Sequence, residues 1–302
     1  MNDIMKKINR TMRGSNLYMI IVIVLVVLII LSSLFVYFFR GDNRGTGTPT
    51  TDVVNDNGST LTVSDIYNGD VEIPKFDYAL NTYDTAQFTS NSDGTISYPN
   101  SYKGIDVSEH QGTIDWAKVK EAGYDFAMIR VGYRGYTRGR IYDDTTFESN
   151  IQGATEQGMK VGLYFFSQAV TVAEAEEEAS LVLSMIGDYQ IDYPIAFDWE
   201  PVDDSEARTN SITGDEVSTI AAAFCDKISK AGYNTAVYIN KTQAYNFYNL
   251  DTIKNYDIWY AEYQAAPSLY YDFTMWQYTA TGTVDGIDGT ADINISFKDY
   301  SK

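Results

Sequence analysis

From residue 104 onward, short runs of apolar residues alternate with longer segments in which apolar residues recur every three or four positions. Short apolar runs bounded by turn residues are typical of buried strands, and the longer periodicity is typical of amphipathic helices. Helix starts are indicated by capping-box signatures at Thr171–Glu174 and Thr213–Glu216. The segments with the first pattern are predicted to be strands: Gly104–Ser108, Phe126–Tyr133, Lys160–Phe166, Pro194–Asp198, Thr235–Ile239, Asp257–Ala261, Phe273–Tyr278 and Ala291–Ile295.

About eight strands with helices between them predict an α/β fold, specifically a TIM-like β/α barrel. The connections between the last strands are short and carry little helical pattern. We therefore expect an irregular barrel in which the last strands break the regular repeat. In such barrels the functional site lies at the carboxyl ends of the strands.

A longer apolar run precedes the barrel. Residues 17–39 contain no charged side chain, and these twenty-three residues are enough for a helix to cross about 30 Å of hydrocarbon. The run ends without the small-residue exit of a cleavable signal peptide. Four Lys or Arg residues precede the run and two, Arg40 and Arg44, follow it closely, which favours residues 1–16 in the cytoplasm. The sequence predicts a single-pass transmembrane helix over 17–39, with everything after Arg40 outside the cell membrane.

Residues 40–101 are rich in Gly, Thr, Ser, Asn and Asp, which predicts an extracellular linker. Within it, Val63–Phe88 has enough Ile, Tyr and Phe to fold locally against the following domain. Residues 102–302 form the predicted barrel domain.

Composition removes several kinds of chemistry. The chain has a net charge of −19, so nucleic acid is an unfavourable partner. One cysteine and one histidine exclude a disulfide framework and a zinc-ligand cluster, and no phosphate-binding or dinucleotide-binding fingerprint is present. We therefore expect neither a metal nor a cofactor, and carboxylate chemistry remains.

The most informative segment is Pro194–Glu200, an apolar run that ends in two carboxylates separated by one residue. Alternate side chains of a strand share a face, so Asp198 and Glu200 should point together, about 6.6 Å apart along the strand. That separation lies between the two carboxylate geometries of glycosidases. A carboxylate at the mouth of a buried strand must be paired or functional.

Two further acids should reach the same end of the barrel. Asp106 lies on the first predicted strand and Asp292 lies in the last. Four carboxylates from three strands would then face one groove, which is costly unless they share protons, solvent or a substrate.

Taken together, the motifs resemble those of family 25 glycoside hydrolases, the lysozyme family that cuts peptidoglycan between N-acetylmuramic acid and N-acetylglucosamine. The resemblance covers about Tyr102 to Tyr300. It is carried by Gly104-Ile-Asp-Val-Ser-Glu-His-Gln-Gly112 with Ile114-Asp-Trp116, Phe197-Asp-Trp-Glu200, Trp259-Tyr-Ala261, Trp276-Gln-Tyr278 and Val284-Asp-Gly-Ile-Asp-Gly-Thr-Ala-Asp-Ile-Asn294.

The resemblance implies a role for each acid. Glu200 would be the general acid that protonates the leaving sugar oxygen, which requires a raised pKa. Asp198 would be its partner, and two roles stay open: it activates water, or it steadies the substrate's own 2-acetamido group as that group attacks. Asp106 and Asp292 would tune charge and orient the sugar.

Aromatic and polar side chains near the strand ends are candidates for substrate binding. Tyr164, Tyr238, Trp259 and Trp276 could stack on sugar rings or pack in the core, and Gln277 follows the last of them. His110 is expected at the groove edge rather than as a base. Arg130 would place a cation in or beside the barrel, where it could pair with one of the acids.

Two alternatives compete with a membrane-anchored lysozyme whose partners are peptidoglycan glycan strands and, through one helix, the membrane. A catalytically inactive peptidoglycan-binding scaffold of a cell-envelope assembly would be favoured by loss of Glu200 or Asp198, and both are present. A chitinase-like barrel would require an acid at Ala196.

Overall fold

The computed structural model describes residues 53–300. The predicted transmembrane helix at 17–39 and the predicted cytoplasmic segment 1–16 lie outside the described residues. Over the described range, no helix combines the length and the apolar composition that a membrane span needs.

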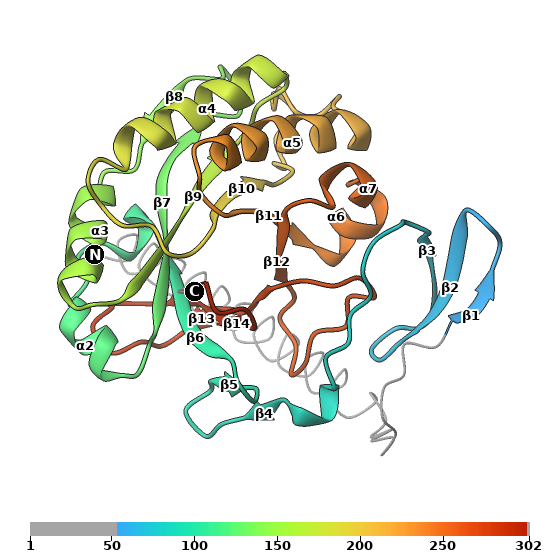
Figure 1. Ribbon diagram of the computed structural model, residues 1–302, viewed down its shortest axis with the longest axis horizontal. Coiled ribbons are helices and arrows are strands. Elements are labelled where there is room, and N and C mark those ends of the chain that lie inside the picture. Colours follow the sequence, from blue (N-terminus) through green and yellow to red (C-terminus); the bar gives the residue numbers. More distant parts are fainter. Residues whose placement is uncertain (1–52, 301–302) are drawn as a thin grey trace, which may run out of the picture. The chain divides into compact units, whose positions relative to one another are not determined.

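The core of the fold is a closed barrel of eight strands (Figure 1). Seven successive strands are parallel, and pairing of the first of them with both the second and the last strand closes the barrel. All eight predicted strands are confirmed: β6 Tyr102–Val107, β7 Phe126–Arg134, β9 Lys160–Ser167, β10 Ile195–Trp199, β11 Thr235–Asn240, β12 Asp257–Ala261, β13 Met275–Gly282 and β14 Ala291–Ser296.

The last strand makes the barrel irregular, as the sequence predicts. Strand β14 runs antiparallel to both of its neighbours, β13 and β6. The beginning of β14 therefore lies at the end of the barrel where the other strands finish, and Asp292 is paired in register with Asp106. This reversal brings a residue near the start of a strand to the site end of the barrel.

Helices cover the outside of the barrel along the earlier strands. Contacts join α3 (Phe147–Glu156) to β7 and β9, and α5 (Gly214–Lys230) to β10, β11 and α4 (Val172–Met185). The predicted capping box at Thr213–Glu216 forms in both directions. At Thr171 only the N-cap bond from the backbone of Glu174 forms, because the Glu174 carboxylate accepts from the backbone N–H of Val170 instead. The shorter helices are α2 Trp116–Glu121, α6 Lys241–Asn246, α7 Leu250–Ile253 and the 3-10 turn η2 Glu109–Gln111.

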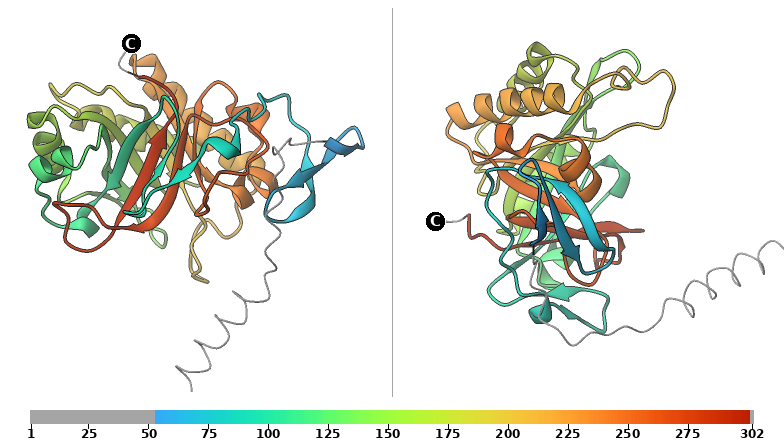
Figure 2. Two further views of the ribbon diagram at one scale, coloured as in Figure 1. Left: turned by 90° about the horizontal axis from the view of Figure 1, so that it is seen from below. Right: turned by 90° about the vertical axis from the view of Figure 1, so that its right-hand side faces the viewer.

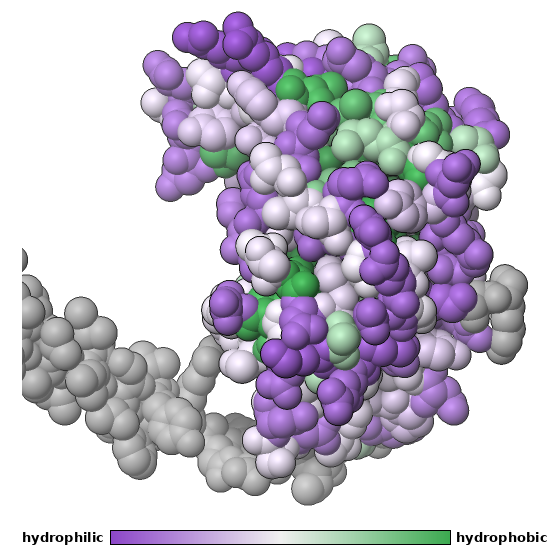
Figure 3. Space-filling view, turned by 90° about the vertical axis from the view of Figure 1, so that its left-hand side faces the viewer, coloured by the Kyte–Doolittle hydropathy of each residue, from purple (hydrophilic) through white to green (hydrophobic). Residues whose placement is uncertain are grey.

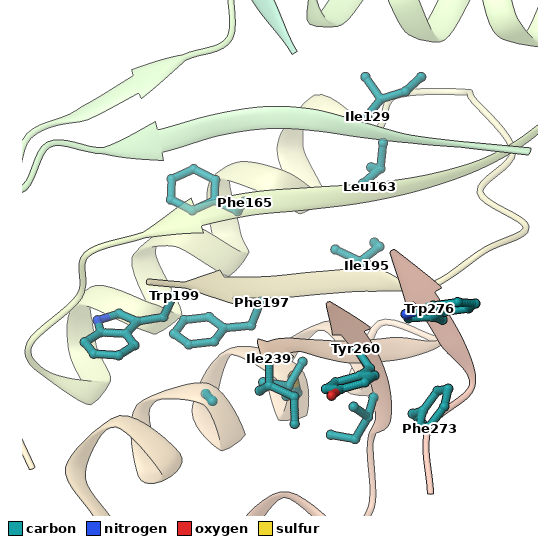
Figure 4. Packing of buried hydrophobic residues seen from close by; sticks show 14 of the residues in the cluster. Ile129, Leu163, Phe165, Ile195, Phe197, Trp199, Ile239, Tyr260, Phe273 and Trp276 are labelled. Atoms are coloured by element: carbon teal, nitrogen blue, oxygen red, sulfur yellow. The ribbon is translucent and has the colours of Figure 1, made fainter. Parts of the chain in front are cut away.

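Alternation along each strand separates two apolar layers. Outward residues such as Leu163, Phe165 and Phe197 pack between the barrel and its surrounding segments (Figure 4). Inward residues fill the barrel and form a second cluster: Phe126, Met128, Tyr164, Tyr193, Ala196, Ala236, Tyr238, Trp259, Ala261, Met275 and Tyr300. On β10 this alternation places Asp198 on the inward face with Ala196.

Within the predicted linker 40–101, the residues that the structure describes, 53–101, are folded. They contain β1 Val53–Asp56, β2 Thr60–Asp65 and β3 Gly69–Pro74 in one antiparallel sheet, then η1 Thr85–Gln87, β4 Thr89–Ser90 and β5 Ile96–Ser97. Figures 1 and 2 show this sheet beside α6. Asp65 at the end of β2 pairs with Lys241 of α6 at 2.7 Å, so the local folding expected for Val63–Phe88 occurs.

Most of the surface seen in Figure 3 is hydrophilic, with apolar residues gathered in small patches. The burial of the large apolar side chains in the two layers explains this distribution.

Space inside the barrel is limiting at Gly104 of β6. A Cβ atom there would lie 2.3 Å from the ring of Phe126, its register partner on β7. We expect Gly104→Ala to lower the free energy of unfolding by about 1–3 kcal/mol through overpacking. Denaturant unfolding measures this, with Gly135→Ala as control because a Cβ there meets only ordinary contacts. Equal stability of the two variants would contradict the packing argument.

Candidate active site

The four predicted acids lie at one end of the barrel. Asp106 is near the end of β6, Asp198 is on β10, Glu200 directly follows β10, and Asp292 is the second residue of β14. Asp106 and Asp198 are each only 6% exposed, and Glu200 and Asp292 are partly buried. Asp106 and Asp292 are register partners, and the charges of neighbouring acids in this cluster contribute to the raised pKa values of Asp106, Asp198 and Glu200.

Burial raises the pKa of every one of these carboxyl groups, because water no longer solvates the charged form. The pKa of Asp292 rises to about 6. For Glu200, burial and then the charge of Asp292 raise the pKa. For Asp198, burial, Glu200 and Asp106 raise the pKa well above its ordinary value. The site is therefore suited to retaining protons at pH values where exposed carboxyl groups are ionised.

Asp106 is oriented by two buried amides. Its Oδ2 atom accepts hydrogen bonds from Gln277 Nε2 and Asn294 Nδ2, each at 2.8 Å. Gln277 Oε1 accepts from the hydroxyls of Tyr238 and Tyr263, both at 2.9 Å. Because the amide oxygen is held by these phenols, the amide nitrogen of Gln277 faces Asp106.

Asn294 is held in the same way. Its Oδ1 atom accepts from Trp259 Nε1 at 2.8 Å, so its Nδ2 donates to Asp106. These two amides favour the ionised form of Asp106 and partly offset the effect of burial and of Asp292, which raise its pKa.

Two other buried glutamines fix the backbone that carries Glu200. Gln168 Nε2 donates to the carbonyl oxygen of Glu200 at 2.8 Å, and Gln243 Nε2 donates to that of Trp199 at 2.6 Å. Directly before these two anchored residues, Asp198 Oδ1 is buried and accepts no hydrogen bond within residues 53–300. A buried oxygen of this kind is available to a donor on a bound molecule.

The predicted substrate-binding residues divide into two groups. Tyr164 and Tyr238 line the barrel interior close to the acids. Burial raises the pKa of each hydroxyl, and the charges of Asp106 and Asp198 add to the effect. Gln277 also reaches the site, through Asp106.

Trp259 and Trp276 correct the prediction of stacking residues. Trp259 is 1% exposed inside the barrel, below the acids, where it anchors Asn294. Trp276 is fully buried in the outer layer, and its Nε1 donates to the carbonyl oxygen of Glu262. Trp276 and Gln277 are adjacent on β13, so their side chains point to opposite faces of the strand. Neither tryptophan offers a ring face to a ligand.

Sequence reasoning missed Tyr263, which is 54% exposed and bonded to Gln277. Continuing the alternation of β12 through Trp259 and Ala261 places residue 263 on the inward face, so the strand pattern held a usable signal. Gln168 and Gln243 carry no such signal, because they act on the backbone of a distant strand.

Arg130 and His110 lie beside the acid cluster. Arg130 pairs with Asp144 at 2.7 Å and with Glu109 at 3.3 Å, and not with any of the four acids by direct contact. Its charge still lowers the pKa of Asp198. His110 is exposed on η2. Within the described range, no group of three His, Cys, Asp or Glu side chains is arranged to hold a metal ion.

Comparison with known proteins gives a consistent family. The model of the family described as "Glycosyl hydrolases family 25" matches residues 105–287. The autolytic lysozyme of Clostridium acetobutylicum is 31% identical over 196 residues, covering 64% of this chain and 55% of that protein. Lysozyme M1 of Streptomyces globisporus is 29% identical, covering 64% of this chain and 66% of that protein.

Among solved structures, the modular autolysin LytC of Streptococcus pneumoniae superposes with a TM-score of 0.58 at 25% identity, covering 82% of this chain and 58% of that one. This chain thus spans between about half and two thirds of the length of these relatives.

The raised pKa of Asp292 makes stability depend on pH. Below about pH 4, the Asp292 carboxyl group is protonated in both the folded and the unfolded protein. Between about pH 4 and pH 6 it ionises in the unfolded chain but keeps its proton in the folded protein, so the free energy of unfolding falls as the pH rises. We expect Asp292→Asn to remove this loss, giving a gain on the order of 1 kcal/mol at pH 7 after allowance for partial solvation. Melting temperatures of both proteins from pH 4 to 8 test this, and parallel curves would contradict it.

Proposed function

The chain belongs to glycosyl hydrolases family 25, and on this basis we propose that it is a peptidoglycan hydrolase cleaving the β-1,4 bond between N-acetylmuramic acid and N-acetylglucosamine. The observation that carries the proposal is the cluster of Asp106, Asp198, Glu200 and Asp292, with raised pKa values, at one end of the barrel. Glycoside hydrolysis needs a carboxylic acid that is protonated near neutral pH beside a second carboxylate.

Glu200 acts as the general acid in this proposal. Gln168 donates a hydrogen bond to the backbone carbonyl oxygen of Glu200 and so fixes the backbone that carries this acid. Burial and then the charge of Asp292 raise the pKa of the Glu200 carboxyl group. It gives its proton to the glycosidic oxygen as the bond to the anomeric carbon breaks, and Asp292 helps to keep that proton in place beforehand.

Asp198 assists on the other side of the bond. Its buried, unpartnered Oδ1 suits the N–H of the 2-acetamido group of the muramic acid. When the acetamido oxygen attacks the anomeric carbon, positive charge develops on that group and favours ionised Asp198, although burial raises its pKa in the free protein. The competing role for Asp198 is activation of a water molecule. Cleavage requires the acetyl group of the muramic acid if the acetamido group attacks, and does not require it if water attacks directly.

Asp106 orients this machinery. The amides of Gln277 and Asn294 fix one oxygen of Asp106, and its charge contributes to the raised pKa of Asp198. Asp106 thus tunes charge and positions the acetamido group or the sugar.

We also propose that the enzyme acts from the cell membrane. The charge-free residues 17–39 and the excess of cations before them support a single-pass anchor with residues 1–16 in the cytoplasm. The hydrolase domain then lies outside the membrane, and its reach is limited to the adjacent face of the wall. Protease accessibility of the barrel domain in intact, wall-stripped cells tests this orientation.

Replacing the general acid should abolish turnover. We expect Glu200→Gln to lower kcat on purified peptidoglycan by about 10²–10⁴-fold, because the leaving oxygen loses its proton donor. Identifying the new reducing ends in digests by the full-length chain tests the bond assigned here. Muramic acid ends that disappear in the variant support the proposal. Glucosamine ends would refute the bond assignment, and no products from folded wild type on several wall types would favour a binding scaffold.

Tyr263 should contribute to substrate binding through its exposed ring. We expect Tyr263→Ala to raise KM roughly three- to tenfold through lost ring contact, whereas Tyr263→Phe keeps the ring and removes only the bond to Gln277. Trp276→Phe is the matched control, because its buried position predicts lower stability with unchanged KM. A larger KM effect at Trp276 than at Tyr263 would refute this assignment.

A further inference from the structure

A pocket of about 750 Å³ opens beside the acid cluster. It lies between η2, β7 and the adjoining strand β8, Ile141–Asp143. Phe166, which lines the pocket, is the register neighbour of Asp198 on β9. The pocket and the proposed cleavage site therefore share a wall. A volume of this size suits an organic ligand of several residues better than a lone ion.

The pocket is basic although the chain carries a net charge of −19. Four arginines line it. Two of them are neutralised internally: Arg130 by Asp144 and Glu109, and Arg134 by Glu178 and Glu177. Arg130 and Arg134 thus have their positive charges balanced by carboxylates of the protein itself.

The other two arginines have no acidic partner. Arg138 and Arg140 are exposed near the tip of the β7–β8 hairpin, and neither forms an ion pair within residues 53–300. Two guanidinium groups thus border the pocket with their charge unmatched. Guanidinium groups bind carboxylates through paired, charge-assisted hydrogen bonds.

The hairpin holding these arginines is braced rather than loose. Arg134 Nη1 donates to the carbonyl oxygen of Gly139 at 2.6 Å, and the backbone N–H of Arg208 donates to that of Tyr136 at 2.9 Å. Arg208 belongs to the segment that follows Glu200. The hairpin is therefore tied to the same segment as the proposed general acid.

Aromatic side chains complete the pocket. The rings of Tyr133 and Tyr142 stack with centroids 5.2 Å apart, and the guanidinium of Arg130 lies 5.2 Å from the centroid of Tyr133. Tyr142 is 45% exposed. The pocket thus combines unmatched positive charge with exposed aromatic surface, a combination that favours a peptide carrying carboxylates over a neutral sugar.

We infer that this pocket binds the stem peptide of peptidoglycan, with Arg138 and Arg140 pairing with its carboxylates. This inference rests on the proposed function, because the peptide is attached through the lactyl group of the muramic acid whose bond is cut. Whichever members of the acid cluster are ionised repel a peptide carboxylate from the cleavage site. The adjacent arginines offer it a position that the same substrate can reach, so the enzyme distinguishes glycan with peptides from bare glycan.

The test compares two substrates from one wall preparation: glycan strands that retain stem peptides and strands stripped of them by an amidase. We expect wild type to have a kcat/KM roughly tenfold or more higher on the first, as charged hydrogen bonds would give. Arg138→Gln with Arg140→Gln should remove this preference through KM and leave activity on stripped strands unchanged. Arg138→Lys with Arg140→Lys should keep part of it.

The matched control is Lys120→Gln with Lys230→Gln, which removes the same charge from exposed positions. These residues lie near the ends of α2 and α5, just before strands β7 and β11, and so at the opposite end of the barrel from the site. We expect this control to behave as wild type. Equal loss on both substrates in the arginine variant, or an unchanged preference, would overturn the inference.

Direct binding separates failure of the subsite from failure of the enzymatic proposal. A muramyl peptide titrated into Glu200→Gln protein and observed by NMR should bind, and should bind roughly tenfold more weakly when Arg138 and Arg140 are also replaced by Gln. Absence of hydrolysis with binding intact would refute only the proposed activity. Discrimination that vanishes on removing wall phosphate polymers, rather than stem peptides, would refute the peptide assignment.

Discussion

Four carboxyl groups lie together at the mouth of a barrel where little water reaches them. Much of the surrounding structure offsets the free-energy cost of placing these acids there. An ionised carboxylate without solvent or partner is costly, and neighbouring negative charges add to the cost. The site meets this in different ways at different acids. Asp106 receives two amide donors, whereas Asp198 and Glu200 respond chiefly through raised pKa values. A general acid also requires a raised proton affinity. The burial and crowding of the acids, which destabilise the fold, therefore also produce the protonation state that the proposed reaction needs.

Barrel closure determines which acids meet. With β14 antiparallel to its neighbours, Asp292 enters the cluster from the start of a strand and lies in register with Asp106. Below the acids, Trp259 and the tyrosines fill the interior and hold the amides that orient Asp106. The aromatic residues inside the barrel therefore support the site from beneath, and Tyr263 at its rim is an exposed aromatic side chain that a ligand can contact.

Charge is segregated within a few strands of the site. The acids occupy the barrel mouth, and the unmatched arginines occupy the adjoining hairpin, with Arg130 and its partners Asp144 and Glu109 between them. This arrangement would orient a substrate with a neutral sugar backbone and charged side branches. The neutral backbone is favoured beside the acids, and the negatively charged branches are favoured beside the arginines. Because the β7–β8 hairpin is hydrogen-bonded to the segment that follows Glu200, this bond links the arginine-bearing hairpin to the acid cluster.

The sequence by itself determined the eight strands, the helix caps and the identity of the four acids, because each depends on periodicity or on spacing along a few neighbouring residues. The tertiary structure decided the direction of β14, the burial of Trp259 and Trp276, and the folding of residues 53–101 against the barrel. It also decided that Arg130 pairs with Asp144 and Glu109 rather than with the acids. These outcomes depend on which segment lies across from a side chain, and that partner can be far away in the chain: Tyr83 bonds to the carbonyl of Phe273, and Gln243 to that of Trp199. A local pattern specifies the face of a strand, but only packing specifies what covers that face.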